Sequence, residues 1–178
     1  MRGRRAVLSL GANLGDRLGT LQAAVDALAR TPGVRVTAVS SVYETSPVGG
    51  PAQPDFLNAA VLADASLPPL ALLDRALQLE TELGRVRAAR WGPRVIDIDL
   101  IVVGEAVLDS SRLVLPHPRA AARAFVLSPW HELEHDAVLP GAGPVTDLLA
   151  GLLAGLPPAG LRRRAELSLR HPVAGTTR

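Results

Sequence analysis

The residues best suited to chemistry lie in one stretch, RVRAARWGPRVIDIDLI, at residues 85–101. Asp97 and Asp99 stand in its apolar second half, and residues two apart in an extended strand project from the same face. Neighbouring carboxylates in apolar surroundings repel each other and lose hydration, so a cation is their natural partner. Four arginines surround the preceding Trp-Gly-Pro turn: Arg85, Arg87, Arg90 and Arg94. Arginines there could hold phosphates that such a cation bridges, so the pattern indicates metal-assisted chemistry on a nucleotide.

The same residues also have a purely structural interpretation. Aspartates in an alternating pattern often mark the solvated face of an antiparallel strand, and arginines in a loop are often simply solvated. Ile96, Ile98 and Leu100 would then be the buried face of an ordinary strand. Both interpretations remain open on these residues alone.

The elements that must position these residues follow from apolar periodicity and from the Gly and Pro residues that interrupt it. We predict strands at 6–10, 34–43, 56–63 and 95–103, helices at 14–28 and 68–83, a Gly- and Pro-rich loop at 45–54, a short hairpin from 95–103 through Gly104 and Glu105 to 106–108, and helices with loops from Pro116 to about Leu153. The order β-α-β-β-α-β predicts an α+β fold with an antiparallel sheet and helices on one face.

Length and composition bound the class of protein. A chain of 178 residues suits one compact domain, and because only 3% of the residues are aromatic, Leu, Val and Ala must fill the core. We expect one domain at 1–156 and a peripheral or disordered arginine-rich tail at 157–178. There is no cysteine, which excludes disulfides and thiolate metal sites. The basic, then apolar start is too short for a signal peptide and no apolar run could span a membrane, so we expect a cytoplasmic protein without a membrane partner.

All 19 basic residues are arginine, which excludes a phosphate-loop lysine and Schiff-base chemistry. The net charge is +2, but residues 1–5 hold three arginines and residues 162–178 hold five against one glutamate, so residues 6–161 carry −5. A nucleic-acid binder would carry its positive charge on the folded domain, so we expect no nucleic-acid partner.

Five stretches give the chain a resemblance to a known family. They are LSLGANLGDR at 8–17, SSVYETSPVG at 40–49, QPDFLNAAV at 53–61, GRVRAARWGPRVIDIDLI at 84–101 and RLVLPHPRAAARAFVL at 112–127. In this order they resemble the 6-hydroxymethyl-7,8-dihydropterin pyrophosphokinases. The resemblance implies a ferredoxin-like βαββαβ core with a C-terminal helical and loop extension. It also implies transfer of pyrophosphate from ATP to a pterin alcohol in folate biosynthesis, by a protein that we expect to be a monomer.

The resemblance assigns roles on the nucleotide side residue by residue. Asp97 and Asp99 match aspartates that bind two Mg²⁺ ions, which prefer oxygen ligands and retain waters and phosphates. The catalytic residues it implies are these two with Arg90 and Arg94, and Arg90 and Trp91 fall in a mobile catalytic loop. The ATP-binding positions it implies are Glu80, Arg87, Trp91, Arg94, Ile98, Arg112, His117 and Arg123.

On the pterin side, the resemblance assigns Thr45, Pro47, Val48, Phe56, Asn58 and Phe125. The two phenylalanines would stack on the flat ring, and the Asn58 amide would pair with its donor and acceptor edge. Family members often carry Tyr where Phe56 stands, so a hydroxyl contact is absent here. From the residues alone, both phenylalanines could instead be ordinary core residues.

The implied reaction is in-line attack by the pterin hydroxymethyl oxygen on the β-phosphorus of ATP, releasing AMP. Two alternatives remain, one from another class and one a closer relative of this reaction. A ferredoxin-like binding module would explain the fold but not the aspartate pair, whereas a nucleotidyl- or ordinary phosphoryltransferase would use the same pair.

Overall fold

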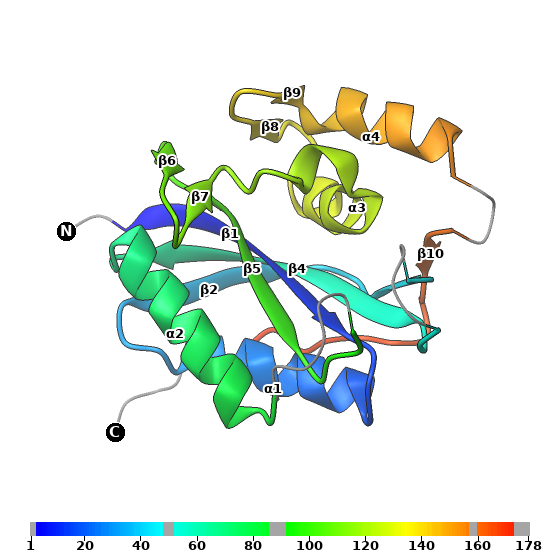
Figure 1. The fold of residues 1–178 in the computed structure, drawn as a ribbon, viewed down its shortest axis with the longest axis horizontal. Helices are drawn as coiled ribbons and strands as arrows, with labels where there is room; N and C mark the ends of the chain where they lie inside the picture. Colours follow the sequence, from blue (N-terminus) through cyan, green and yellow to red (C-terminus); the bar gives the residue numbers. More distant parts are fainter. Residues whose placement is uncertain (1–2, 48–51, 86–91, 157–159, 173–178) are drawn as a thin grey trace.

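The computed structural model describes residues 3–47, 52–85, 92–156 and 160–172, and these form a central sheet covered by helices on both faces (Figure 1). The strands of the central sheet are β1 (Arg4–Ala12), β2 (Val34–Val39), β3 (Tyr43–Thr45), β4 (Phe56–Ala65), β5 (Asp97–Val103) and β10 (Arg162–Arg163). The helices are α1 (Arg17–Ala29), α2 (Pro69–Glu82), α3 (Ala124–Leu133) and α4 (Val145–Ala154), with a 3₁₀ turn at Ala120–Ala122.

The strand order is β10-β3-β4-β1-β5, with β2 also paired to β4, and every pairing is antiparallel. The predicted α+β fold and its β-α-β-β-α-β order are therefore confirmed. The predicted helix at 14–28 is observed as α1 and that at 68–83 as α2, each shifted by one to three residues.

The predicted strand at 34–43 is interrupted. β2 ends at Val39 and β3 begins at Tyr43, although both pair with β4. The break occurs at Ser40 and Ser41, where side chains take the place of some backbone partners. The Ser40 hydroxyl accepts the Ala60 N–H at 2.9 Å, and the Ser41 N–H donates to Glu132 at 3.0 Å. Side chains that bond nearby backbone groups compete with a regular ladder, and apolar alternation does not reveal this competition.

The predicted hairpin from β5 through Gly104 is wrong. Residues 104–105 form a turn, but β6 (Leu108–Asp109) pairs with β7 (Val114–Leu115) rather than with β5. Ser110 closes this later hairpin, because its hydroxyl accepts the Leu113 N–H at 3.1 Å and donates to the Leu113 carbonyl at 3.0 Å.

Two apolar clusters hold the layers together. On one face, Leu8 and Leu10 of β1 pack with α1 and α2. On the other face, Val7 packs with α3 and with Val145 and Leu149 at α4, where a second small hairpin, β8 (Val138–Leu139) with β9 (Gly143–Pro144), precedes the helix. The core helices thus cover one face as predicted, and the C-terminal extension covers the other (Figure 1). No helix within the described ranges is long and apolar enough to span a membrane.

Part of the predicted tail packs against the domain. β10 pairs with β3 at the edge of the sheet, and Leu167 and Leu169 contact the apolar cluster under α1 and α2. The boundary after residue 156 stays a prediction, but residues 162–169 extend the sheet and the core. Figure 1 shows this segment returning beneath the sheet toward α1.

Candidate active site

β5 presents two different faces, as the alternation predicts. Ile98 and Leu100 are each 3% exposed and lie in the apolar cluster, whereas Asp97 and Asp99 are only half-buried. β5 is an edge strand that pairs with β1, where Asp99 lies opposite Ser9 and Asp97 opposite Gly11. A rigid sheet edge therefore holds both carboxylates on the face turned away from α1 and α2.

Two cavities meet at these carboxylates. The first, of about 550 Å³, lies between α2, β5 and residues 110–119, and the second, of about 380 Å³, lies over β3 and β4. Five residues line both cavities: Gly92, Arg94, Asp97, Asp99 and Arg119. Ligands in the two cavities would thus approach each other beside the aspartate pair.

The first cavity gathers most of the residues predicted to bind ATP. Those lining it are Glu80, Arg94, Ile98, Arg112 and His117. Arg123 lines the second cavity, where it contacts Asp99. Arg87, Arg90 and Trp91 lie outside the described residues. The first cavity is therefore lined by several cationic side chains and, on one side, by carboxylates, which suits a polyphosphate bound with metal ions.

The second cavity gathers the described residues predicted to bind the pterin. Thr45, Pro47, Phe56, Asn58 and Phe125 all line it, while Val48 lies outside the described residues. Both phenylalanines are partly exposed, so they are cavity walls rather than ordinary core residues.

The second cavity is floored by Gly11. A Cβ at this position would stand 3.3 Å from Asn58 Oδ1 and 3.9 Å from Phe56 Cδ1. The glycine therefore lets the Asn58 amide and the Phe56 ring approach the backbone of β1. The guanidinium carbon of Arg123 lies 5.5 Å from the centre of the Phe125 ring and adds a positive charge to the opposite wall.

Each aspartate is held by a different set of cations. Asp97 accepts from Arg85 at 2.6 Å and from Arg94 at 2.5 Å. Asp99 accepts from Arg123 at 3.2 Å, and His117 Nε2 lies 3.8 Å from the same oxygen. The negative charge is thus compensated by groups on three segments of the chain, which is the arrangement expected where anions are later bound.

Burial and mutual repulsion set the ionisation of this site. Burial, followed by the charge of Asp97, raises the pKa of Asp99 above its ordinary value. Burial lowers the pKa of His117, although Asp99 opposes the shift. His117 Nδ1 accepts the Arg119 N–H at 3.1 Å, so the neutral ring carries its proton on Nε2, facing Asp99.

Glu80 links α2 to β5. Its carboxylate is buried and accepts the Ile98 N–H at 2.7 Å and Arg85 at 2.5 Å. Burial raises the pKa of Glu80, and Asp97 adds to the shift against the opposing bonds from Ile98 and Arg85. Within the structure Glu80 thus fixes the outer edge of β5, between Asp97 and Asp99.

Three residues at the site were not assigned from the sequence. For Arg85 two interpretations stayed open, a phosphate contact or a solvated side chain, and in the structure its side chain is 18% exposed and bridges Glu80 and Asp97. Asn13 is buried, accepts the Arg94 N–H at 2.8 Å and donates to the Pro54 carbonyl at 3.0 Å. It therefore links the segment before β5 with the segment before β4. Arg119 lines both cavities. Arg85 stands in the arginine-rich stretch before Asp97, but no spacing indicates its contact with Glu80, five residues earlier. Asn13 and Arg119 lie in matching stretches, where the resemblance assigned them no role.

The site fits divalent cations that use few protein ligands. Among the described residues, no group of three or more His, Asp or Glu side chains could surround a metal ion. Mg²⁺ is commonly bound by one or two carboxylates with waters and substrate phosphates completing its shell. The pKa of Asp99 is raised first by burial and then by the charge of Asp97, and a bound dication would favour its ionised form.

Comparisons with known proteins show the family of this chain. Residues 7–135 match the family model of 7,8-dihydro-6-hydroxymethylpterin-pyrophosphokinase. A 2-amino-4-hydroxy-6-hydroxymethyldihydropteridine pyrophosphokinase of Methylorubrum extorquens is 48% identical over 89% of this chain and 98% of its own length. A protein of the same name from Mycobacterium tuberculosis is 43% identical over 96% of both chains.

Solved structures support the fold. The chain resembles an HPPK-DHPS protein crystallised in complex with substrates, with a TM-score of 0.69, 12% identity and 86% of this chain covered. A Plasmodium falciparum HPPK-DHPS gives a TM-score of 0.67 at 14% identity over 85% of this chain. The match spans 44% and 46% of those longer chains. The predicted ferredoxin-like core is thereby confirmed.

Proposed function

Because the chain belongs to the 7,8-dihydro-6-hydroxymethylpterin-pyrophosphokinase family, we propose that it transfers pyrophosphate from ATP to 6-hydroxymethyl-7,8-dihydropterin. The products are AMP and the pterin diphosphate, an intermediate of folate biosynthesis. The observation that carries the proposal is the meeting of two cavities at Asp97 and Asp99. One cavity suits a polyphosphate and the other a flat ring, and a transfer reaction needs both ligands beside one metal-binding edge.

The first cavity takes the triphosphate. Arg94, Arg112 and His117 project into it from three segments, so phosphate oxygens can be bound from several directions. This spread matters because the charge of a transferring phosphoryl group is delocalised over its oxygens. In this proposal Arg94 leaves its contact with Asp97 for a phosphate when the nucleotide binds.

The second cavity takes the pterin. Phe56 and Phe125 offer aromatic faces for a conjugated ring, and the Asn58 amide can both donate and accept at its edge. Asn58 Nδ2 donates to Thr45 Oγ1 at 2.9 Å, which fixes the amide plane toward the cavity. The hydroxymethyl group then points to the shared wall at Asp97 and Asp99.

Catalysis follows from position and charge. Asp97 and Asp99 would hold two Mg²⁺ ions, which supply charge neutralisation on the phosphate oxygens. The pterin hydroxymethyl oxygen attacks the β-phosphorus of ATP in line with the departing AMP. Asp97 lies beside the attacking hydroxyl, and Arg94 and Arg123 flank the pair and offset the charge that develops during transfer.

A single assay tests the reaction. The protein is incubated with Mg²⁺, ATP and 6-hydroxymethyl-7,8-dihydropterin, and the nucleotide products are separated. We expect AMP and the pterin diphosphate in equal amounts, and none of either after chelation of the metal. ADP or free pyrophosphate would instead indicate an ordinary phosphoryl- or nucleotidyltransferase, and binding without turnover a binding module.

The partners that we propose are these small molecules alone. Both cavities are lined by one chain, and the net charge of −5 on residues 6–161 disfavours nucleic acid. We propose a cytoplasmic monomer, because ATP is abundant in the cytoplasm and the residues of a single chain line both cavities. Light scattering at assay concentration checks the mass, and a dimer that loses activity on dilution would contradict the proposal.

A further inference from the structure

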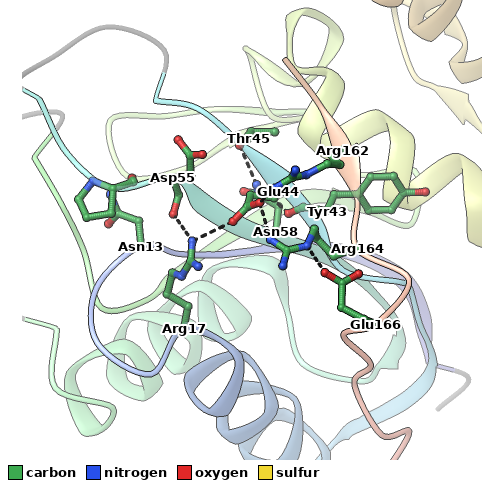
Figure 2. A network of polar contacts seen from close by, with 11 residues as sticks. Asn13, Arg17, Tyr43, Glu44, Thr45, Asp55, Asn58, Arg162, Arg164 and Glu166 are labelled. Carbon is green, nitrogen blue, oxygen red and sulfur yellow. Dashed lines mark hydrogen bonds and ion pairs between the residues drawn. The ribbon is translucent and has the colours of Figure 1, made fainter. Parts of the chain in front are cut away.

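A buried carboxylate outside both cavities joins three arginines. Glu44, in the middle of β3, has a side chain only 8% exposed. Arg17 at the start of α1 contacts it at 3.2 Å, Arg164 at 2.5 Å, and Arg162 forms a further ion pair. Figure 2 shows the three guanidinium groups converging on Glu44 from separate parts of the chain. A carboxylate this enclosed is retained only where it is well paired.

The network connects the far C-terminal segment to β3. β10 pairs antiparallel with β3, with Arg162 opposite Glu44, and the Arg164 N–H donates to the Val42 carbonyl at 2.8 Å. β3 is three residues long and would otherwise be an edge strand. Such a short strand has few bonds of its own, so its position depends on what lies beside it.

Glu44 sits directly behind the wall of the second cavity. Side chains alternate along β3, so Glu44 faces α1 while Thr45 faces the cavity. Thr45 Oγ1 accepts the Asn58 amide at 2.9 Å, and Thr45 lies opposite Phe56 across the β3–β4 ladder. Three of the residues that line the second cavity therefore depend on the placement of β3.

Arg17 extends the support to the next strand. The same Nη1 that contacts Glu44 donates to the Asp55 carbonyl at 2.7 Å, immediately before Phe56 (Figure 2). One guanidinium thus links β3 with the start of β4. The first cavity has no such link in the described residues, since its lining comes from α2, β5 and residues 92–119.

We propose that Glu44, clamped by Arg162 and Arg164, is a positioning residue of the pterin site, and that the C-terminal segment acts on catalysis through it. The clamp holds Thr45 and the Asn58 amide in the geometry that the pterin edge requires. Holding a binding group in place before the ligand arrives removes an ordering cost from binding. The inference rests on the proposed function, because it takes the second cavity as the pterin site.

The test compares two double variants in the full chain. Arg162→Ala with Arg164→Ala removes the clamp, whereas Arg162→Lys with Arg164→Lys retains the charges and donors. KM is measured for the pterin and for ATP, and the thermal midpoint is recorded for each protein. We expect the alanine variant to raise KM for the pterin about tenfold, equivalent to the loss of one bond to a charged group, and KM for ATP less than about twofold. The lysine variant should recover most of the pterin affinity.

Arg170→Ala is the matched control. This arginine is exposed on the same segment, and its backbone rather than its side chain bonds Gln22. We expect wild-type KM values for both substrates. Should the alanine double variant fail to fold, Arg162→Ala replaces it, because that side chain is 65% exposed and its removal leaves no cavity.

Three outcomes are distinguishable. A selective rise in KM for the pterin, rescued by lysine, supports the clamp. A lower thermal midpoint with unchanged KM for the pterin, or an equal rise in both KM values, overturns it and leaves a structural role. If the wild-type protein itself forms no AMP, the proposed function fails, whatever the variants do.

Discussion

Single residues at the edge that we propose to bind metal are not equivalent, although Asp97 and Asp99 are only two positions apart. Asp97 carries two arginine contacts, at 2.6 and 2.5 Å, whereas Asp99 has one at 3.2 Å and a raised pKa caused first by burial. A carboxylate whose pKa is raised by folding disfavours the folded state when ionised. The two residues share a proposed catalytic role, and we expect them to differ in their effect on stability.

This difference predicts different behaviour for two asparagine variants. Asp99→Asn and Asp97→Asn should each lower AMP formation at least about a hundredfold, because each removes an anionic ligand. With metal removed by a chelator, Asp99→Asn should have the same free energy of unfolding as the wild type, since it removes a poorly compensated charge. Asp97→Asn should lower it, because Arg85 and Arg94 lose their partner. Urea unfolding measures both, and an Asp97→Asn protein with full activity would exclude the metal role.

The stacking residues give a second prediction at this scale. Phe125→Leu should raise KM for the pterin about tenfold and leave KM for ATP unchanged, because an aromatic face is lost from the second cavity alone. Phe56→Tyr is the matched control, since it keeps a ring, and should stay within about twofold of the wild type. An equal effect of Phe125→Leu on both substrates would contradict the assignment of the cavities. Steady-state kinetics with each substrate varied gives the answer.

Among the elements, the junction of α2 and β5 positions Asp97 and Asp99. Glu80 on α2 accepts the Ile98 N–H, which an edge strand would otherwise leave to water, and also binds Arg85. One buried carboxylate thus fixes the position of β5 relative to α2 and the position of Arg85 beside Asp97. Glu80 matches an ATP-binding position, but its contacts here are with the protein itself.

These contacts predict graded effects at Glu80. Glu80→Ala should cost about 2–3 kcal/mol of unfolding free energy, because it leaves the Ile98 N–H and Arg85 without their acceptor. Glu80→Gln should cost less, since an amide oxygen still accepts the N–H, and since burial already raises the pKa of Glu80 and disfavours its charge. Denaturant midpoints measure the order. Equal losses for Ala and Gln would show that the charge, not the N–H bond, dominates.

How far sequence predicts these elements depends on whether their cause is local. The strand at 95–103 and the helix at 68–83 follow from alternation and helical spacing, and the structure confirms both apart from their end residues. The break at Ser40 was missed because its cause is a bond to Ala60, twenty residues away. The hairpin after Gly104 was misplaced because Ser110, rather than the turn next to β5, closes it.

The same division holds for the site. The aspartate pair and the phenylalanines stand in matching stretches, and in the structure they line the two cavities, while their roles stay predictions. Arg85 and Asn13 act through partners that no spacing reveals. Glu44 was missed for the same reason, because its partners lie about 120 positions away.

For the whole molecule, the ion pairs at Glu44 make stability depend on pH. Burial would raise the pKa of Glu44, but hydrogen bonds from Arg162 and Arg164 outweigh it and leave the pKa below its ordinary value of 4.5. A lowered pKa in the folded state means that the contribution is complete above about pH 5.5 and is lost as pH falls through the folded pKa.

The prediction is a pH-dependent difference between two proteins. Glu44→Gln should unfold at lower urea concentration than the wild type at pH 7, because the three arginines lose an anion. The difference should shrink as pH falls below about 4.5, because the unfolded chain then takes up a proton that the folded carboxylate resists. Urea midpoints at pH 7, 5 and 3.5 measure it, with Arg170→Ala as control. A constant difference across this range would show that Glu44 contributes by packing rather than by charge.

The pairing of β10 with β3 also bears on how the chain is made. The ribosome synthesises Glu44 more than a hundred residues before Arg162 and Arg164, so during that interval the outer backbone groups of β3 have no strand to pair with. An exposed edge of this kind can recruit another extended peptide, including a second nascent copy. The arrival of residues 162–164 ends that exposure, so the sheet is completed and protected from aggregation in the same event.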